Sequence, residues 1–365
     1  MTFRVIKQRL RALLLRRWRR PALYGLVLRA EHALFGRKLR IETSSQCQLA
    51  CPLCSTAVPQ QDWRRDHRQV IGWGNLGVEN FKRLLDGAGR VREIEISNWG
   101  EVFLNRELPA ILEYAHQRGV TLTASNGVNR NTASDAVLEA LVRFGFRQLV
   151  VSIDGASDET YKIYRRNGAL HRVLAHIDRI NHFKALYRSA VPRLTWRFIV
   201  FGHNEHEIDL ARAMATARGM AFEPLQNLDN SYSPINNLEA VKRKTGIDGS
   251  RNVDTLLGDA ANAFDYCSQL WDAPQINWDG ALLGCCMNNM RAFDNVLEVG
   301  LQRALNGEAY RYAKKMVLGL APARADIPCS VCPLYSGTRD ARLCELSPQS
   351  PVAYTSAVPP SWGQQ

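Results

Sequence analysis

Three closely spaced cysteines constrain this chain more than any other feature of its sequence. Cys47, Cys51 and Cys54 follow the alternating stretch 38–43, which predicts a β-strand, so one short loop carries all three thiols. Three such thiolates can bind three irons of one iron–sulfur cluster and leave the fourth iron open, whereas most four-iron clusters use four cysteines. An open metal position suits chemistry on a bound ligand. A structural zinc site is the alternative, but structural zinc usually takes four protein ligands.

The total cysteine count points to the same chemistry. Nine cysteines in 365 residues are an odd number, and an odd number argues against a disulfide framework and for metal or redox chemistry in a reducing compartment. No stretch of 18 uncharged apolar residues is present, and charges interrupt the apolar run that follows Arg19 and Arg20, so that run does not read as an export leader. We therefore expect a cytoplasmic protein.

The net charge of +12 is concentrated at the N-terminus. Residues 1–40 contain 12 Lys and Arg and one Glu, and the rest of the chain is close to neutral. This distribution argues against a nucleic-acid-binding surface on the fold. Apolar residues recur at helical spacing between the arginines of 1–37, which predicts a basic amphipathic helix. Such a helix either packs on the body of the protein or docks at the periphery of an anionic membrane or on a partner.

The three-cysteine loop resembles the signature of the radical S-adenosylmethionine (SAM) enzymes. The resemblance implies that Cys47, Cys51 and Cys54 bind a [4Fe–4S] cluster whose open iron chelates SAM. A flavodoxin- or ferredoxin-type reductant would then supply the electron that cleaves SAM to a 5′-deoxyadenosyl radical. The sequence departs from the family at Leu53, where the family usually has an aromatic residue.

Later segments follow the same family pattern in order. Gly100-Glu101 resembles the centre of the Gly-Gly-Glu-Pro motif, although Trp99 and Val102 differ from it. Gly100 permits close backbone approach, and the resemblance implies that Glu101 accepts the SAM ammonium. A strand over 120–124 leads into a Ser-Asn-Gly turn, and a strand over 148–153 leads into Asp-Gly. The SAM contacts that the resemblance implies are Gly100, Glu101, Asn126, Ser152, Asp154 and Arg165, of which Arg165 would bind the SAM carboxylate unless it is a surface arginine.

Strands and helices alternate through the first two thirds of the chain. Strands are expected at 38–43, 92–98, 120–124, 148–153, 194–201 and 221–225, with helices over 78–85, 107–118, 133–144, 172–186 and 205–218 between them. Alternating units of this kind form a parallel sheet, and six of them resemble the partial (β/α)6 TIM-type barrel of radical SAM enzymes. The motifs fall at the carboxyl ends of strands, where barrel enzymes place their sites.

A second cysteine system lies near the C-terminus. Cys267-x12-Gly280-x4-Cys285 and Cys329-x2-Cys332 form two pairs, and residues 278–280 predict a hairpin turn that brings Cys267 and Cys285 together. The pattern resembles the SPASM auxiliary-cluster module, and more closely its shortened twitch form, which implies a second [4Fe–4S] cluster bound by four cysteines. A zinc ribbon is the alternative.

Two cysteines then have no assigned cluster. Cys286 and Cys344 are either buried as small apolar residues or donate a hydrogen atom to a substrate radical, as in radical SAM epimerases. The expected organisation is an N-terminal helix over 1–37, a barrel over 38–235, a linker over 236–262, the small twitch-like module over 263–346 and a disordered tail over 347–365, which has four prolines and no charge.

The resemblance implies an oxidoreductase-type enzyme. It would abstract hydrogen from a small-molecule or peptide substrate and oxidise it by dehydrogenation, with the auxiliary cluster as electron acceptor. Epimerisation, or formation of a carbon–sulfur or carbon–carbon crosslink in a peptide or natural product, is the second hypothesis. A non-enzymatic metal-binding protein that docks through its basic N-terminus is the third.

Overall fold

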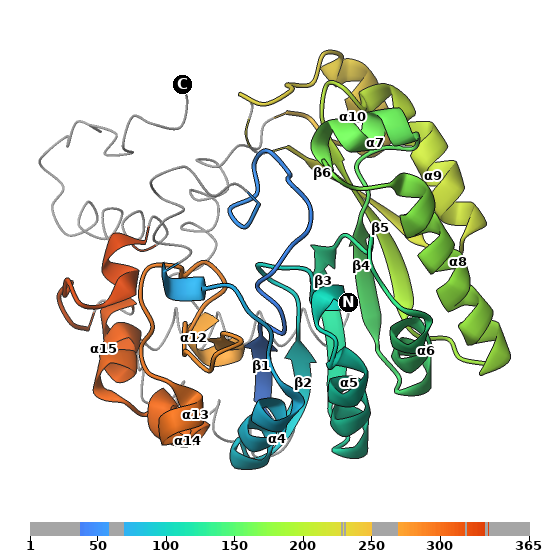
Figure 1. Cartoon of the computed structure of the whole chain (residues 1–365). Helices are drawn as coiled ribbons and strands as arrows, with labels where there is room; N and C mark the ends of the chain where they lie inside the picture. The colour runs from blue at the N-terminus through green and yellow to red at the C-terminus, as the bar shows by residue number, and fades with distance from the viewer. Residues whose placement is uncertain are drawn as a thin grey trace, which may run out of the picture.

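A parallel β-sheet of seven strands organises the fold (Figure 1). The computed structural model describes residues 37–57, 69–227, 229, 231–249, 269–317, 320–332 and 335. The strands are β1 Arg37–Ile41, β2 Val91–Glu95, β3 Thr121–Val128, β4 Gln148–Ser152, β5 Arg193–Val200, β6 Ala221–Gln226 and β7 Gln275–Ile276, arranged in the order β6-β5-β4-β3-β2-β1-β7. Because β6 and β7 are both edge strands, the sheet does not close. The predicted partial barrel is therefore confirmed, with one strand more than predicted.

Alternation along the strands divides the sheet into an apolar and a polar face. Leu39 and Ile41 of β1 are buried in the main core, whereas Lys38 of β1 pairs with Glu93 of β2 at 2.7 Å on the other face. Helices cover the apolar face (Figure 1). They are α4 Val78–Gly87, α5 Leu108–Gln117, α6 Asp135–Arg143, α8 Leu170–Leu186 and α9 Ile208–Ala217. The polar face is left to line the inside of the open barrel.

Two short segments differ from the sequence-based prediction. Ser125-Asn126-Gly127, predicted as a turn, lies inside β3, because Val128 still pairs with Val151 of β4 across a register shift. Gly127 accommodates that irregularity with a φ of 107°, a value that favours glycine. The range predicted as a linker contains the helix α10 Leu238–Thr245, and its Val241 is buried in the main core.

The C-terminal module is built onto the edge of the barrel sheet. Its two-residue strand β7 pairs in parallel with β1, and antiparallel bridges join Ile276 to Leu282 and Ala281 to Asn295. The predicted hairpin turn over 278–280 is confirmed. The remaining helices of the module are α12 Gln269–Asp272, α13 Val296–Val299, α14 Leu301–Leu305, α15 Glu308–Val317 and the 3-10 helix η3 Pro328–Val331. One continuous sheet therefore joins the barrel and the module.

Several predictions fall outside the described residues. They concern the N-terminal helix up to residue 36, the cysteines Cys267 and Cys344, and the tail over 347–365. Within the part of the chain that the structure describes, no helix is both long and apolar enough to cross a membrane.

Candidate active site

The loop after β1 carries the three cysteines and packs against aromatic residues from a neighbouring helix and from the end of a neighbouring strand. Cys51 is 3% exposed and lies in a small apolar cluster with Leu49, Tyr164 and Phe201, against which Cys47 and Cys54 also pack. Burial, with a smaller contribution from negative charge on Glu101, Cys54 and Cys51, raises the pKa of the Cys47 thiol to about 12. The three thiols are thus close enough to influence one another's ionisation.

The donor set, three thiol sulfurs on one loop, is of the kind that binds an iron–sulfur cluster. No group of three or more Cys, His, Asp or Glu side chains within the described ranges is spaced to hold one ion. In a four-iron cluster each cysteine binds a different iron, so the ligands stand farther apart than around a single zinc. The raised thiol pKa values mean that binding of the metal has to displace protons.

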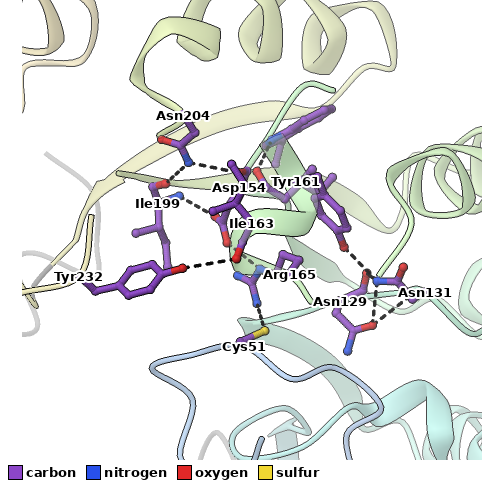
Figure 2. A network of polar contacts seen from close by, with 12 residues as sticks. Cys51, Asn129, Asn131, Asp154, Tyr161, Ile163, Arg165, Ile199, Asn204 and Tyr232 are labelled. Atoms are coloured by element: carbon purple, nitrogen blue, oxygen red, sulfur yellow. Dashed lines mark hydrogen bonds and ion pairs between the residues drawn. The ribbon is translucent and has the colours of Figure 1, made fainter. Parts of the chain in front are cut away.

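A buried ion pair connects the fourth strand to the cysteine loop. The helix α7 Asp158–Tyr164 is capped by Ser157, whose Oγ accepts a hydrogen bond from Thr160 N, and is followed by Arg165. Arg165 Nε lies 2.6 Å from Asp154 Oδ2, and Arg165 Nη1 lies 3.9 Å from Cys51 Sγ (Figure 2). The Arg165 side chain is only 13% exposed, so it is not a surface arginine.

The positive charge of Arg165 is strongly fixed. Burial lowers the pKa of Arg165, but the interactions with Asp154, Cys51, Tyr164 and Tyr161 together outweigh burial and hold that pKa well above its ordinary value. Asp154 is fully buried, and its second oxygen accepts a hydrogen bond from Ile199 N at 2.8 Å. Asp154 therefore holds the guanidinium of Arg165 at Nε, while Nη1 of the same guanidinium reaches the cysteine loop.

Gly100 and Glu101 join the cysteine loop to the end of β2. Gly100 packs directly on the loop, since a Cβ atom there would lie 2.2 Å from Ser44 O, and Glu101 N donates to Gln46 O at 2.6 Å. Both Glu101 oxygens accept backbone N–H groups, Oε2 from Asn129 at 2.6 Å and Oε1 from Phe103 at 3.3 Å. Burial raises the pKa of Glu101 to about 7. Its observed contacts hold loops together, and its contact with the SAM ammonium stays a prediction.

Glu42 is a site residue that the sequence reasoning missed. It lies directly after β1, is fully buried and accepts hydrogen bonds from Trp99 N at 2.8 Å and Gly100 N at 3.3 Å. Burial raises its pKa to about 8, the two backbone N–H groups oppose that rise, and Glu95 adds to it. The only signal in the sequence was an acidic residue between an apolar strand and the cysteines. Glu42 fixes the backbone that carries Gly100 and Glu101.

Asn126 lies inside β3, two residues before its end, and Ser152 is the last residue of the adjacent strand β4. Asn126 Nδ2 donates to Ser97 O at 2.5 Å, and the Asn126 carbonyl accepts from Arg197 Nη1 at 2.9 Å. Ser152 ends β4, and its Oγ would lie 2.4 Å from a Cβ placed on Gly127. The two side chains therefore share one edge of the sheet with the cysteine loop.

The auxiliary cysteines are described only in part. Cys285 follows the hairpin, and Cys329 and Cys332 lie in and directly after η3. Cys286 contacts the barrel, because its carbonyl accepts from Asn98 Nδ2 at 3.0 Å just beyond β2. The Cys286 backbone N and Sγ both lie close to Gln269 Oε1, at 3.1 and 3.2 Å. This part of the module thus reaches the carboxyl edge of the sheet.

Two sequence-family models match the two halves of this architecture. The model described as the radical SAM superfamily matches residues 41–217, and the SPASM model, described as an iron–sulfur cluster-binding domain, matches residues 267–333. The chain carries a radical SAM domain followed by a SPASM domain. The resemblance predicted from the three cysteines is confirmed. This radical SAM enzyme uses SAM and a [4Fe–4S] cluster, and its SPASM domain implies auxiliary iron–sulfur clusters.

Two solved structures of SuiB share the fold. SuiB of Streptococcus suis bound to S-adenosylmethionine is 13% identical with a TM-score of 0.53, covering 84% of this chain and 74% of SuiB. SuiB bound to its precursor peptide SuiA is 12% identical with a TM-score of 0.54, covering 84% and 73%. BtrN in complex with AdoMet and 2-DOIA is 12% identical with a TM-score of 0.45, covering 80% and 90%. No curated protein matches the chain.

Proposed function

We propose that this radical SAM enzyme oxidises its substrate by dehydrogenation, with an auxiliary [4Fe–4S] cluster as the electron acceptor. When bound, SAM and the catalytic cluster supply a 5′-deoxyadenosyl radical. One hydrogen atom of the substrate would leave to form 5′-deoxyadenosine. The substrate radical would then lose one electron to the auxiliary cluster and one proton to solvent or a base, which completes a two-electron oxidation. The substrate class is a small molecule or a peptide.

The contact between the auxiliary module and the open edge of the sheet carries this proposal. Cys285 is one of the proposed auxiliary ligands, and its neighbour Cys286 is hydrogen-bonded through its carbonyl to Asn98. Asn98 Oδ1 also accepts from Asn126 Nδ2 at 3.3 Å, on the side where SAM is proposed to bind. An electron acceptor held there by Cys267, Cys285, Cys329 and Cys332 would be close to a substrate lying over the strand ends.

The chain's own residues would prepare the catalytic centre. Cys47, Cys51 and Cys54 would hold the catalytic cluster. Gly100, Glu101, Asn126, Ser152, Asp154 and Arg165 are the proposed SAM-binding residues, and Arg165 is already oriented by Asp154 at 2.6 Å. An arginine fixed by a buried carboxylate loses little side-chain entropy when it binds a carboxylate ligand. A flavodoxin- or ferredoxin-type protein is the proposed reductant.

Cys286 supports a second candidate, epimerisation. The backbone N–H of Cys286 donates to Gln269 Oε1, which fixes the orientation of the Gln269 amide. Cys286 Sγ lies 3.2 Å from the same oxygen, so the thiol is held as an S–H donor near the carboxyl edge of the sheet. A thiol in that place could return a hydrogen atom to a substrate radical. Cys344 is the other proposed donor. Peptide crosslinking is a further alternative, since the similarly folded SuiB has been solved with its precursor peptide bound.

One isotope experiment separates these reactions. A substrate is first found by untargeted metabolite comparison of cells with and without the enzyme, and the reaction is then run anaerobically in D2O with SAM and a reductant. Dehydrogenation predicts one 5′-deoxyadenosine per product and no deuterium at the product carbon, in the wild type and in the Cys286→Ala variant alike. Deuterium at that carbon, lost in Cys286→Ala, would overturn dehydrogenation in favour of epimerisation.

A separate proposal concerns the basic segment 1–37, which would contact an anionic membrane surface or a partner. A chain lacking residues 1–36 keeps β1 whole, because β1 begins at Arg37. Truncation should abolish cosedimentation with phosphatidylglycerol vesicles while SAM cleavage persists. If the truncated chain instead fails to assemble its clusters, the segment packs on the fold and the proposal is wrong.

A further inference from the structure

Asn129 lies between the end of β3 and the cysteine loop, with its side chain against one proposed cluster ligand. It is 5% exposed, and its Nδ2 lies 3.6 Å from Cys47 Sγ. Neither the family signature nor the sequence reasoning singled it out. Its position raises the question of whether the amide only fills space or acts on the cysteine.

The orientation of the Asn129 amide is set by its other contacts. Oδ1 accepts from the backbone N of Asn131 at 3.0 Å and from Gln48 Nε2 at 2.8 Å. A backbone N–H can only donate, so the oxygen has to face Asn131 and the NH2 group has to face away from it. The N–H of Asn129 is therefore directed toward Cys47 Sγ by geometry that does not involve the cysteine.

The rest of the network keeps Asn129 in place. Its backbone N donates to the buried carboxylate of Glu101 at 2.6 Å. Asn131 in turn donates from Nδ2 to Tyr161 Oη at 2.9 Å (Figure 2). The Oδ1 atom of Asn131 accepts a hydrogen bond from Ala169 N at 2.6 Å. These contacts join Asn129 to the loop after β2, to α7 and to the residue before α8, so the donor is pre-organised rather than mobile.

We propose that Asn129 is a positioning residue that donates an N–H···S hydrogen bond to Cys47 and thereby raises the reduction potential of the catalytic cluster. Hydrogen bonds to ligand sulfur are one of the factors that set cluster potentials. One-electron reduction places more negative charge on the thiolate, so the donor stabilises the reduced state more than the oxidised state. The inference rests on the proposed role of Cys47 as a ligand.

Two substitutions test this proposal. Asn129→Leu has nearly the same shape but no N–H, and Asn129→Asp keeps the oxygen that Asn131 and Gln48 use while replacing the N–H with a negative oxygen. Losing one charge-assisted hydrogen bond should lower the reduced-to-oxidised ratio at a fixed potential about tenfold in Asn129→Leu, equal to about 59 mV for a one-electron couple. Asn129→Asp should lower the ratio further, because it adds charge repulsion.

The matched control is Tyr161→Phe, which removes the Tyr161 hydroxyl from the same network without touching the Asn129 amide. All variants are the full chain, reconstituted anaerobically and titrated by EPR, and the catalytic cluster is recognised as the one whose signal changes when SAM is added. Potentials of both Asn129 variants equal to wild type would overturn the proposal. So would a shift in Tyr161→Phe as large as that in Asn129→Leu. If Asn129→Leu binds no cluster, the potential of Asn129→Asp tests the proposal instead, because this variant keeps the oxygen that accepts from Asn131 and Gln48.

A further variant separates failure of this inference from failure of the ligand assignment. Cys47→Ala should lose the SAM-responsive EPR signal altogether. If Cys47→Ala keeps that signal, Cys47 is not a ligand and the assignment itself is wrong. If the signal is lost but Asn129→Leu leaves the potential unchanged, the cysteine assignment stands and only the role of Asn129 fails.

Discussion

Replacing Gly100 with alanine should disrupt the three-cysteine loop more than any other change of one methyl group. A Cβ at this position would lie 2.2 Å from Ser44 O, 2.6 Å from Ser45 C and 2.7 Å from Gln46 O. All three are backbone atoms, so no side-chain rotation can relieve the contact. Real Cβ atoms essentially never lie within 3.0 Å of such neighbours, and the loop would therefore have to move by about 1 Å.

The size of the effect follows from what that movement breaks. Overpacking against a rigid neighbour typically costs about 1–3 kcal/mol. The cost of Gly100→Ala should lie near the upper end of this range, because the atoms that the new methyl group meets belong to the backbone. The movement would also weaken the hydrogen bonds from Glu101 N to Gln46 O at 2.6 Å and from Gly100 N to Glu42 Oε1 at 3.3 Å, each worth about 1 kcal/mol. We expect Gly100→Ala to lose roughly 3–5 kcal/mol of unfolding free energy.

Gly87→Ala is the matched control. Gly87 is the last residue of α4, and a Cβ there would meet nothing within 4 Å. Alanine in place of an exposed helical glycine is expected to be neutral or to stabilise by about 0.5–1 kcal/mol. The assay is urea unfolding, together with iron and sulfide per chain after anaerobic reconstitution. Equal stability and equal iron content in the two variants would refute the close packing of Gly100 on the cysteine loop.

Two further predictions concern buried charges. Arg165→Met removes the cation from the buried Asp154 carboxylate and leaves it the hydrogen bond from Ile199 N, so the unfolding free energy should fall by about 3–5 kcal/mol. The double variant that also carries Asp154→Asn should recover most of this loss. A loss below about 1 kcal/mol in Arg165→Met would contradict the ion pair. Burial raises the pKa of Glu42 from 4.5 to about 8, so the folded chain holds a proton there that the unfolded chain has released. Wild-type stability should therefore fall relative to Glu42→Gln as the pH rises from about 4.5 to 8. Parallel unfolding curves for the two proteins across that range would show that Glu42 does not titrate as its burial implies.

The order of the strands and the position of the site could be predicted from local patterns. Alternation placed β1 directly before the three cysteines, and helical periodicity placed α4, α5, α6, α8 and α9 between strands. The role of Arg165 is implied by the family resemblance of the segment after β4, but the sequence does not show whether its side chain is buried. That burial depends on contacts with Asp154, 11 residues away, and with Cys51, 114 residues away, which the structure brings together.

Other features depend on contacts that local sequence does not encode. β7 has only two residues and is a strand because β1 offers a free edge. Residues 125–127 read as a turn, but pairing of Val128 with Val151 keeps them in β3. α10 lies in a polar segment and is held by one buried residue, Val241. Glu42 looked like an ordinary acid, and its role comes from a backbone loop almost 60 residues away.

The central claim is that Cys47, Cys51 and Cys54 hold the cluster that cleaves SAM. The most direct test reconstitutes the wild type and a Cys47→Ala/Cys51→Ala/Cys54→Ala variant anaerobically, measures iron and sulfide, and follows release of 5′-deoxyadenosine from SAM with dithionite. We predict about eight irons per wild-type chain and about four in the variant, with 5′-deoxyadenosine formed by the wild type alone. Wild-type protein that holds zinc without iron, or a variant that still releases 5′-deoxyadenosine, would contradict the claim.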